Sequence, residues 1–166
     1  MAPSTAIGEG RGHGMRARSA GFTYVALLFA IAVMGVVLAA TSTVWHQASQ
    51  REKERELLFI GNQFRLAIGN YYLHGPDATK RYPQSLEDLL ADPRGLDKKR
   101  YLRKIYRDPM TNETRWGVIK SPEGGIMGVY SLSQDKPIKT SNFRLIDKDF
   151  EGKIKYREWQ FIYSPT

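Results

Sequence analysis

An unbroken apolar run covers residues 22–40. It carries no charge, and Thr23 is its one clearly polar side chain. As an α-helix these 19 residues would be about 28 Å long, close to the roughly 30 Å hydrocarbon thickness of a bilayer. We therefore expect a transmembrane segment over residues 22–40.

Farther along, apolar residues recur at steps of three and four positions, the spacing of one face of an amphipathic helix. They are Leu57, Ile60, Phe64, Ala67, Ile68 and Tyr71. Charges of opposite sign alternate just before them, at Arg51, Glu52, Glu54 and Arg55. This alternation predicts a solvated face. We expect residues 41–73 to continue the apolar segment as one long N-terminal helix, which ends at His74-Gly75-Pro76.

A connector is expected over residues 74–113, with one short helix in it. Three leucines supply the buried face of that helix, at Leu86, Leu89 and Leu90. Ser85 is the expected N-cap, because Asp88 follows three positions later.

The remaining residues, 114–166, predict a small sheet. Strands are expected over residues 114–120, 126–132 and 153–163, with a turn over residues 121–125. Trp159, Phe161 and Tyr163 alternate along the third strand and so share one face. An antiparallel sheet that covers the apolar stripe of the helix would give an α+β fold.

The distribution of charge predicts how the chain is oriented in a membrane. The 166-residue chain has a formal charge of +8, and Arg11, Arg16 and Arg18 precede the apolar run against the single acid Glu9. Basic residues stay on the cytoplasmic side of a membrane, so the body after residue 40 is expected on the outer side.

The composition excludes several chemistries. The chain has no cysteine, which excludes a disulfide framework, a thiolate nucleophile and a cysteine-ligated zinc. His13, His46 and His74 lie far apart without a spaced partner, and no phosphate-binding glycine loop is present. We expect no enzyme and no cofactor.

Two charged clusters are candidate binding sites. The first is a weak calcium candidate formed by Asp147, Asp149, Glu151 and Glu158, with Gly152 at the position of the loop glycine. Lys148 between the ligands and the strand expected after them favour a solvated turn instead.

The second is the basic patch, which consists of Lys98, Lys99, Arg100, Arg103, Lys104 and Arg107. Tyr101 and Tyr106 alternate with these cations. The favoured interpretation is an exposed face whose tyrosines belong to the core. Contact with anionic lipid or an acidic partner subunit comes second, and DNA binding third.

The residues at the start of the apolar run help to distinguish a cleaved signal peptide, a plain membrane anchor and a processed assembly helix. Ala39-Ala40-Thr41-Ser42 could serve as a signal-peptide cleavage box, and hydropathy alone also allows a plain single-span anchor. However, Gly21-Phe22-Thr23 follows basic residues and opens the run. This junction resembles the processing site of type IV pilin-like proteins, which include the pseudopilins of type II secretion.

The resemblance implies that residues 1–21 are a basic leader, which prepilin peptidase removes by cutting between Gly21 and Phe22. The peptidase then methylates Phe22 and leaves the helix on the mature protein. Phe22, Thr23 and Ala26 would then lie in the assembly helix. The family has a glutamate at the fifth mature position, where this chain has Ala26. Met15 offers an alternative start that would shorten the leader to seven residues.

The connector extends the resemblance. Its Y-P-Q-S-L-E-D-L stretch from Tyr82, followed by Arg107-Asp108-Pro109, is similar to the region after the long helix in major pseudopilins. Some type II pseudopilins also bind calcium in C-terminal loops.

The expected function is therefore that of a pseudopilin-like subunit in the bacterial inner membrane, with a periplasmic body. Its implied partners are prepilin peptidase, other pseudopilin or pilin subunits and the inner-membrane assembly platform. The alternatives are a DNA-binding minor pilin and a plain single-span membrane protein.

Overall fold

The structure is a computed structural model that describes residues 20–75, 80–95 and 98–165. Within these ranges, the side chains of residues 20–21 and 37–45 are not described. The chain divides into two compact units, Met1–Val44 and Trp45–Thr166. Each unit is described by itself.

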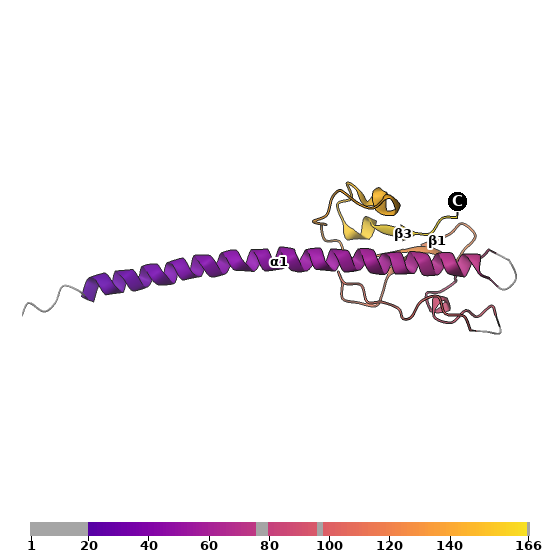
Figure 1. Cartoon of the computed structure of the whole chain (residues 1–166), viewed down its shortest axis with the longest axis horizontal. Coiled ribbons are helices and arrows are strands. Elements are labelled where there is room, and N and C mark those ends of the chain that lie inside the picture. The colour runs from indigo at the N-terminus through magenta and orange to yellow at the C-terminus, as the bar shows by residue number, and fades with distance from the viewer. Residues whose placement is uncertain (1–19, 76–79, 96–97, 166) are drawn as a thin grey trace, which may run out of the picture. The chain divides into compact units, whose positions relative to one another are not determined.

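Helix α1 comprises Ala20–Leu73 and contributes residues to both units (Figure 1). It ends where the sequence predicts, since His74 leaves the helical conformation and its backbone N–H donates to the Asn70 carbonyl over 3.0 Å.

The second unit is α+β, as expected, with one antiparallel sheet. The strands β1 (Gly117–Lys120), β2 (Ile126–Tyr130) and β3 (Gln160–Ile162) lie in the order β1-β2-β3. Val118 pairs with Val129, which pairs with Phe161, and the β1–β2 register shifts between Ile119 and Lys120. All three strands are shorter than predicted.

The prediction of a strand over the whole of residues 153–163 is wrong. Residues Tyr156–Glu158 form the 3-10 helix η3, and only Gln160–Ile162 joins the sheet. The reason is that the backbone N–H groups of Tyr156 and Arg157 donate to the carbonyls of Asp135 and Ser133. These residues are thereby held by a loop and not by a neighbouring strand.

The apolar stripe of α1 is confirmed as the centre of the core. Its six members are all buried, namely Leu57, Ile60, Phe64, Ala67, Ile68 and Tyr71. The sheet approaches the helix closely at Gly61, where an added Cβ would overlap the Phe161 ring. Phe161 and Trp159 are both fully buried, and Tyr163 is half-buried against the same core.

The short connector helix is the 3-10 turn η1, Glu87–Leu89, and Ser85 is not its N-cap. The residue at that position is Leu86, which makes no side-chain cap. Instead the Asp88 carboxylate reaches back and accepts from the Ser85 N–H (3.1 Å) and the Ser85 hydroxyl (2.8 Å). The buried face is confirmed, since Leu89 is fully buried.

Glu54 corrects the prediction of a solvated face before the stripe. Its neighbours Glu52 and Arg55 form the expected exposed ion pair over 3.1 Å. Glu54 itself is only 3% exposed, and its Oε1 accepts from the backbone N–H of Ile138 and the Tyr156 hydroxyl. It lies three residues before Leu57 and therefore on the buried side of the helix.

Candidate functional site

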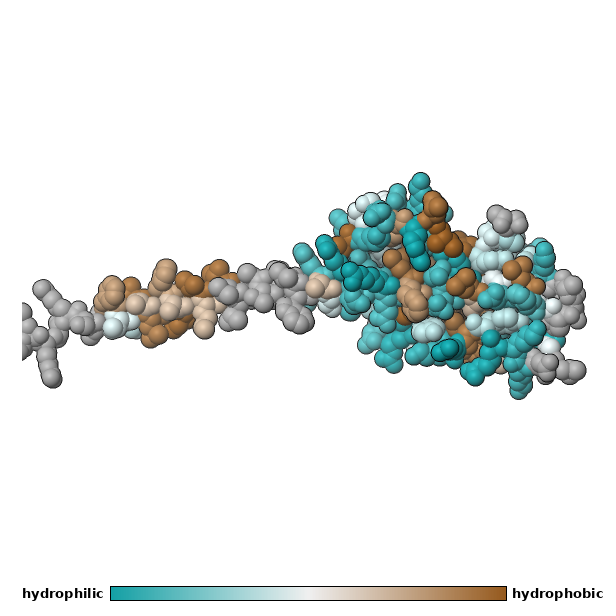
Figure 2. All heavy atoms as spheres, viewed as in Figure 1, coloured by the Kyte–Doolittle hydropathy of each residue, from teal (hydrophilic) through white to brown (hydrophobic). Residues whose placement is uncertain are grey.

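An exposed apolar surface covers the N-terminal part of α1. Every side chain from residue 22 to residue 36 is exposed, and the large ones range from 46% for Val33 to 79% for Phe22. Figure 2 shows this stretch in brown on the face in view. A helix that is apolar on all sides is normally buried in lipid or in packed helices, so this segment requires a partner.

The residues of the implied processing junction lie in the first turns of α1. Phe22, Thr23 and Ala26 are exposed, and the first turn contains no acidic residue. Gly21 belongs to the helix, but its surroundings lie outside the described residues. The leader residues before Ala20, including Met15, also lie outside them.

No helix within the described residues is long and apolar enough to cross a membrane. The last four residues of the expected span, 37–40, are among those whose side chains are not described.

The basic patch lies on the surface of the second unit. All six of its cations are exposed, and no carboxylate among the described residues forms an ion pair with them. The two interleaved tyrosines turn inward. Tyr106 meets Phe64 edge to face at 6.3 Å, and Tyr101 meets Tyr71 at 5.6 Å. Both tyrosines are therefore half-buried against the core, and the Lys104 ammonium lies 5.5 Å from the centre of the Tyr106 ring.

An ion pair between a buried carboxylate and a half-buried arginine lies just before the patch and contacts the end of α1. Asp92 and Arg94 are joined over 2.7 Å, and a second Arg94 N–H donates to the Tyr71 carbonyl over 2.8 Å. The Arg94 guanidinium also stacks 3.5 Å from the centre of the Tyr71 ring. Burial raises the pKa of Tyr71 to about 12, although Arg94 opposes the shift. Both side chains therefore keep one charge state at physiological pH.

This ion pair predicts an acid-sensitive contribution to stability. The hydrogen bond from Arg94 holds the pKa of Asp92 below its usual value, although burial opposes it. A depressed folded-state pKa stabilises the fold above about pH 4 and loses that effect as the pH falls further. Asp92→Asn is expected to cost about 1–3 kcal/mol at pH 7. Urea unfolding at pH 7 and pH 3 should show the difference from wild type shrinking at the lower pH; an unchanged difference would contradict the assignment.

Asp108 organises the Arg107-Asp108-Pro109 turn at the other end of the patch. The buried carboxylate accepts from the Met110 N–H over 2.9 Å and from the hydroxyls of Thr111 (3.1 Å) and Ser131 (2.7 Å). Ser131 directly follows β2. The turn therefore ties the basic patch to the sheet.

Asp147, the first ligand of the calcium candidate, is already bonded to two arginines. Asp147 is 1% exposed, and its two carboxylate oxygens accept from Arg65 over 2.9 Å and from Arg144 over 3.1 Å. Asp149 and Glu151 are exposed, whereas one Glu158 oxygen accepts from the Ile154 N–H over 2.9 Å. Among the described residues, no group of three metal-binding side chains is placed to hold an ion. Asp147 is thus the partner of a buried arginine.

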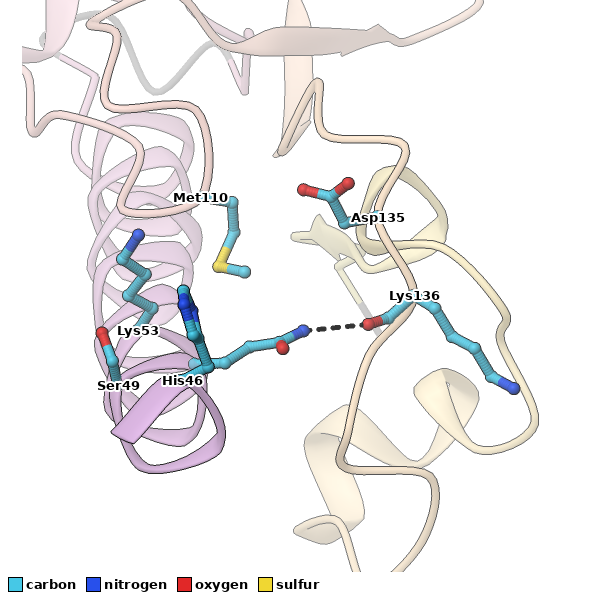
Figure 3. A pocket seen from close by; sticks show the side chains of 7 residues that line it. His46, Ser49, Lys53, Met110, Asp135 and Lys136 are labelled. Atoms are coloured by element: carbon cyan, nitrogen blue, oxygen red, sulfur yellow. Dashed lines mark hydrogen bonds between the residues drawn. The ribbon is translucent and has the colours of Figure 1, made fainter. Parts of the chain in front are cut away.

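A separate cavity of about 330 Å³ lies beside the part of α1 that begins the second unit (Figure 3). Seven residues line it, namely His46, Ser49, Gln50, Lys53, Met110, Asp135 and Lys136. Gln50 crosses one end and donates to the Lys136 carbonyl over 3.0 Å and to the Tyr156 hydroxyl over 2.8 Å.

The sequence reasoning missed these polar contacts for different reasons. Glu54 could have been found, because its helical spacing from Leu57 places it on the buried face. Arg65 directly follows the buried Phe64, but nothing in the sequence pairs it with Asp147, 82 positions away. The lining of the His46 cavity comes from three separate segments of the chain, which no local pattern connects.

Comparison of the chain with protein-family models, with curated proteins and with solved structures finds no match in any of the three. No relative therefore supplies a site or an activity, and the functional conclusion depends on the residues of this chain.

Proposed function

We propose that the chain is a pseudopilin-like subunit of a type II secretion or type IV pilus-related apparatus and assembles through its N-terminal apolar helix. The observation that carries this proposal is the exposed, all-round apolar surface of residues 22–36, which begins directly after Gly21. Such a surface needs lipid or other helices around it. A pseudopilin uses both in turn, first the bilayer and then the filament core.

In this proposal the first half of a long N-terminal helix spans the bacterial inner membrane over residues 22–40. The leader stays in the cytoplasm, where prepilin peptidase removes it after Gly21 and methylates Phe22. The second unit lies in the periplasm. It contacts neighbouring pseudopilin or pilin subunits, while the assembly platform holds the membrane segment.

Ala26 bears on which kind of subunit the chain forms within the apparatus. A carboxylate inside a bilayer is costly and is kept for a specific partner. With alanine at this position, the chain has no acid to pair with the N-terminal amine of a neighbour. A minor or tip subunit requires fewer identical contacts than a major subunit, and we assign the chain that role.

Blocking the junction tests this proposal. In cells that contain prepilin peptidase, Gly21→Val is expected to keep the full-length mass, because the side chain occupies the cleavage position. Wild type should lose its leader. Gly35→Val is the matched control, since nothing lies within 4 Å of an added Cβ at Gly35 and the junction is untouched. Cleavage of the Gly21 variant at wild-type level would contradict the assignment, and an uncleaved wild type would favour a plain single-span anchor.

DNA binding by a minor pilin is the second candidate, because all six cations of the basic patch are exposed. The salt dependence of binding to a fluorescent duplex separates the two functions. A DNA-binding subunit would lose about two units of salt slope with Lys99→Gln and Arg103→Gln together. The secretion proposal predicts no difference from the matched pair Lys120→Gln and Lys153→Gln.

A further inference from the structure

We infer that the His46 cavity binds a phosphoamine, a group that carries a phosphate and a primary ammonium, as in the headgroup of phosphatidylethanolamine. The choice of a lipid as its source rests on the proposed function, which places this end of the body beside the bilayer. At about 330 Å³ the cavity is at the small end of ligand pockets and suits a headgroup of this size.

One wall of the cavity offers donors for a phosphate. His46, Ser49 and Lys53 are spaced three and four residues apart and therefore share one face of α1. An imidazole, a hydroxyl and an ammonium together provide the charge and the hydrogen bonds that phosphate oxygens accept.

The opposite wall offers an acceptor for an ammonium. Figure 3 shows Asp135 across the gap from His46 and Lys53, while the Lys136 side chain points away from it. The Ser133 hydroxyl donates to Asp135 Oδ2 over 3.0 Å and so orients the carboxylate. Among the described residues, neither Lys53 nor Asp135 forms an ion pair. Opposite charges are thus held apart across a cavity, and a ligand with both charges would bridge them.

The two walls are fixed to each other before any ligand arrives. Gln50 joins α1 to the Lys136 carbonyl, and the buried Glu54 accepts from the Ile138 and Lys139 N–H groups one turn later. Binding would therefore need little rearrangement of the backbone around the cavity, while the exposed side chains of His46, Ser49, Lys53 and Asp135 turn toward the ligand.

The position along the chain favours a lipid headgroup over a soluble ligand. Residue 46 follows the end of the expected span by only six residues in the sequence. The proposed function puts that span in the bilayer, so a lipid headgroup is the source of ligand that it favours.

Isothermal titration calorimetry of the full chain in detergent tests the inference with three probes. These are short-chain phosphatidylethanolamine, phosphatidylglycerol of equal chain length, and O-phosphoethanolamine. We expect the ethanolamine lipid to bind about tenfold more tightly than the glycerol lipid, because only the ethanolamine headgroup carries an ammonium that can form an ion pair with the Asp135 carboxylate. Asp135→Asn should abolish that selectivity, whereas Lys53→Gln should weaken both lipids about tenfold. The exposed controls Asp149→Asn and Lys120→Gln should change neither.

Equal binding of the two lipids, or selectivity that survives Asp135→Asn, would overturn the inference. Binding of O-phosphoethanolamine as tight as that of the lipid would support the phosphoamine site and assign a soluble source. The state of the N-terminus is measured separately. If Phe22 is methylated but the chain shows no headgroup selectivity, only the inference of a lipid site in the cavity is overturned. If the chain shows headgroup selectivity but its N-terminus is unprocessed, only the proposed function is overturned.

Discussion

Asp147→Ala is expected to lower the free energy of unfolding of the body by about 3–5 kcal/mol, because it leaves the Arg65 guanidinium buried without its counter-charge. The side chains of Arg65 and Asp147 are 6% and 2% exposed. Arg144 bonds the same carboxylate but is 61% exposed, so it can turn to water when the acid is removed. The loss therefore falls on Arg65, whose only other charge-stabilising contact in the described structure is the Phe161 ring at 5.5 Å.

Denaturant unfolding of the full chain in detergent, followed by the fluorescence of the buried Trp116 and Trp159, measures this loss. Asp149→Ala is the matched control, since Asp149 is exposed and should cost at most about 0.5 kcal/mol. Calcium should leave the unfolding midpoint of every variant unchanged. Equal losses from the two substitutions, or a calcium-dependent midpoint in wild type alone, would restore the calcium interpretation of this loop.

Glu54→Ala is expected to cost about 2–4 kcal/mol, because the buried Tyr156 hydroxyl and the half-buried N–H groups of Ile138 and Lys139 lose this acceptor. The Ile138 N–H lies 2.6 Å from Glu54 Oε1, and the Tyr156 hydroxyl lies 2.9 Å from it. Burial also raises the pKa of Tyr156 well above its ordinary value, so the phenol keeps the proton that it donates to Glu54. The substitution should loosen the loop around Ile138 before it affects the sheet.

Hydrogen exchange by the full chain distinguishes this local effect from general unfolding. The amides of Ile138 and Lys139 should exchange faster in the Glu54 variant, while those of β2 change less. Glu56→Ala provides the control, because Glu56 is exposed on the same helix two residues later. Unaltered protection at Ile138 would show that the carboxylate does not hold the loop.

Helical and strand periodicity predicted a large part of the core. The six stripe residues from Leu57 to Tyr71 are all buried, and Trp159 and Phe161 are buried on the sheet side. These predictions succeeded because burial of an apolar face depends on residues close in sequence. The α+β class followed from placing one such face on the other.

The polar contacts were not predictable in the same way. A helix pattern places Glu54 on the buried face, but only the folded chain brings Ile138 to it. Asp147 and Arg65 are far apart in sequence, and the short charged run before Gly152 favoured a solvated turn over a metal loop, neither of which predicts a buried ion pair. The 3-10 helix at Tyr156 likewise depends on carbonyls of a distant loop.

The apolar segment differs from both, because no contact within the described residues buries it. Residues 22–36 are exposed all round, so the sequence predicts a need for burial without identifying what provides it. The glycine at position 21 is the residue that favours a processed assembly helix over an ordinary anchor.

Mass spectrometry of the N-terminal peptide, from protein purified out of membranes that contain prepilin peptidase, tests this central claim most directly. The proposal predicts a terminal peptide that begins at Phe22 and carries one added methyl group. A peptide that begins at Met1 or Met15 would contradict processing at Gly21, and one that begins after Ala40 would show that the apolar run is a cleaved secretion signal.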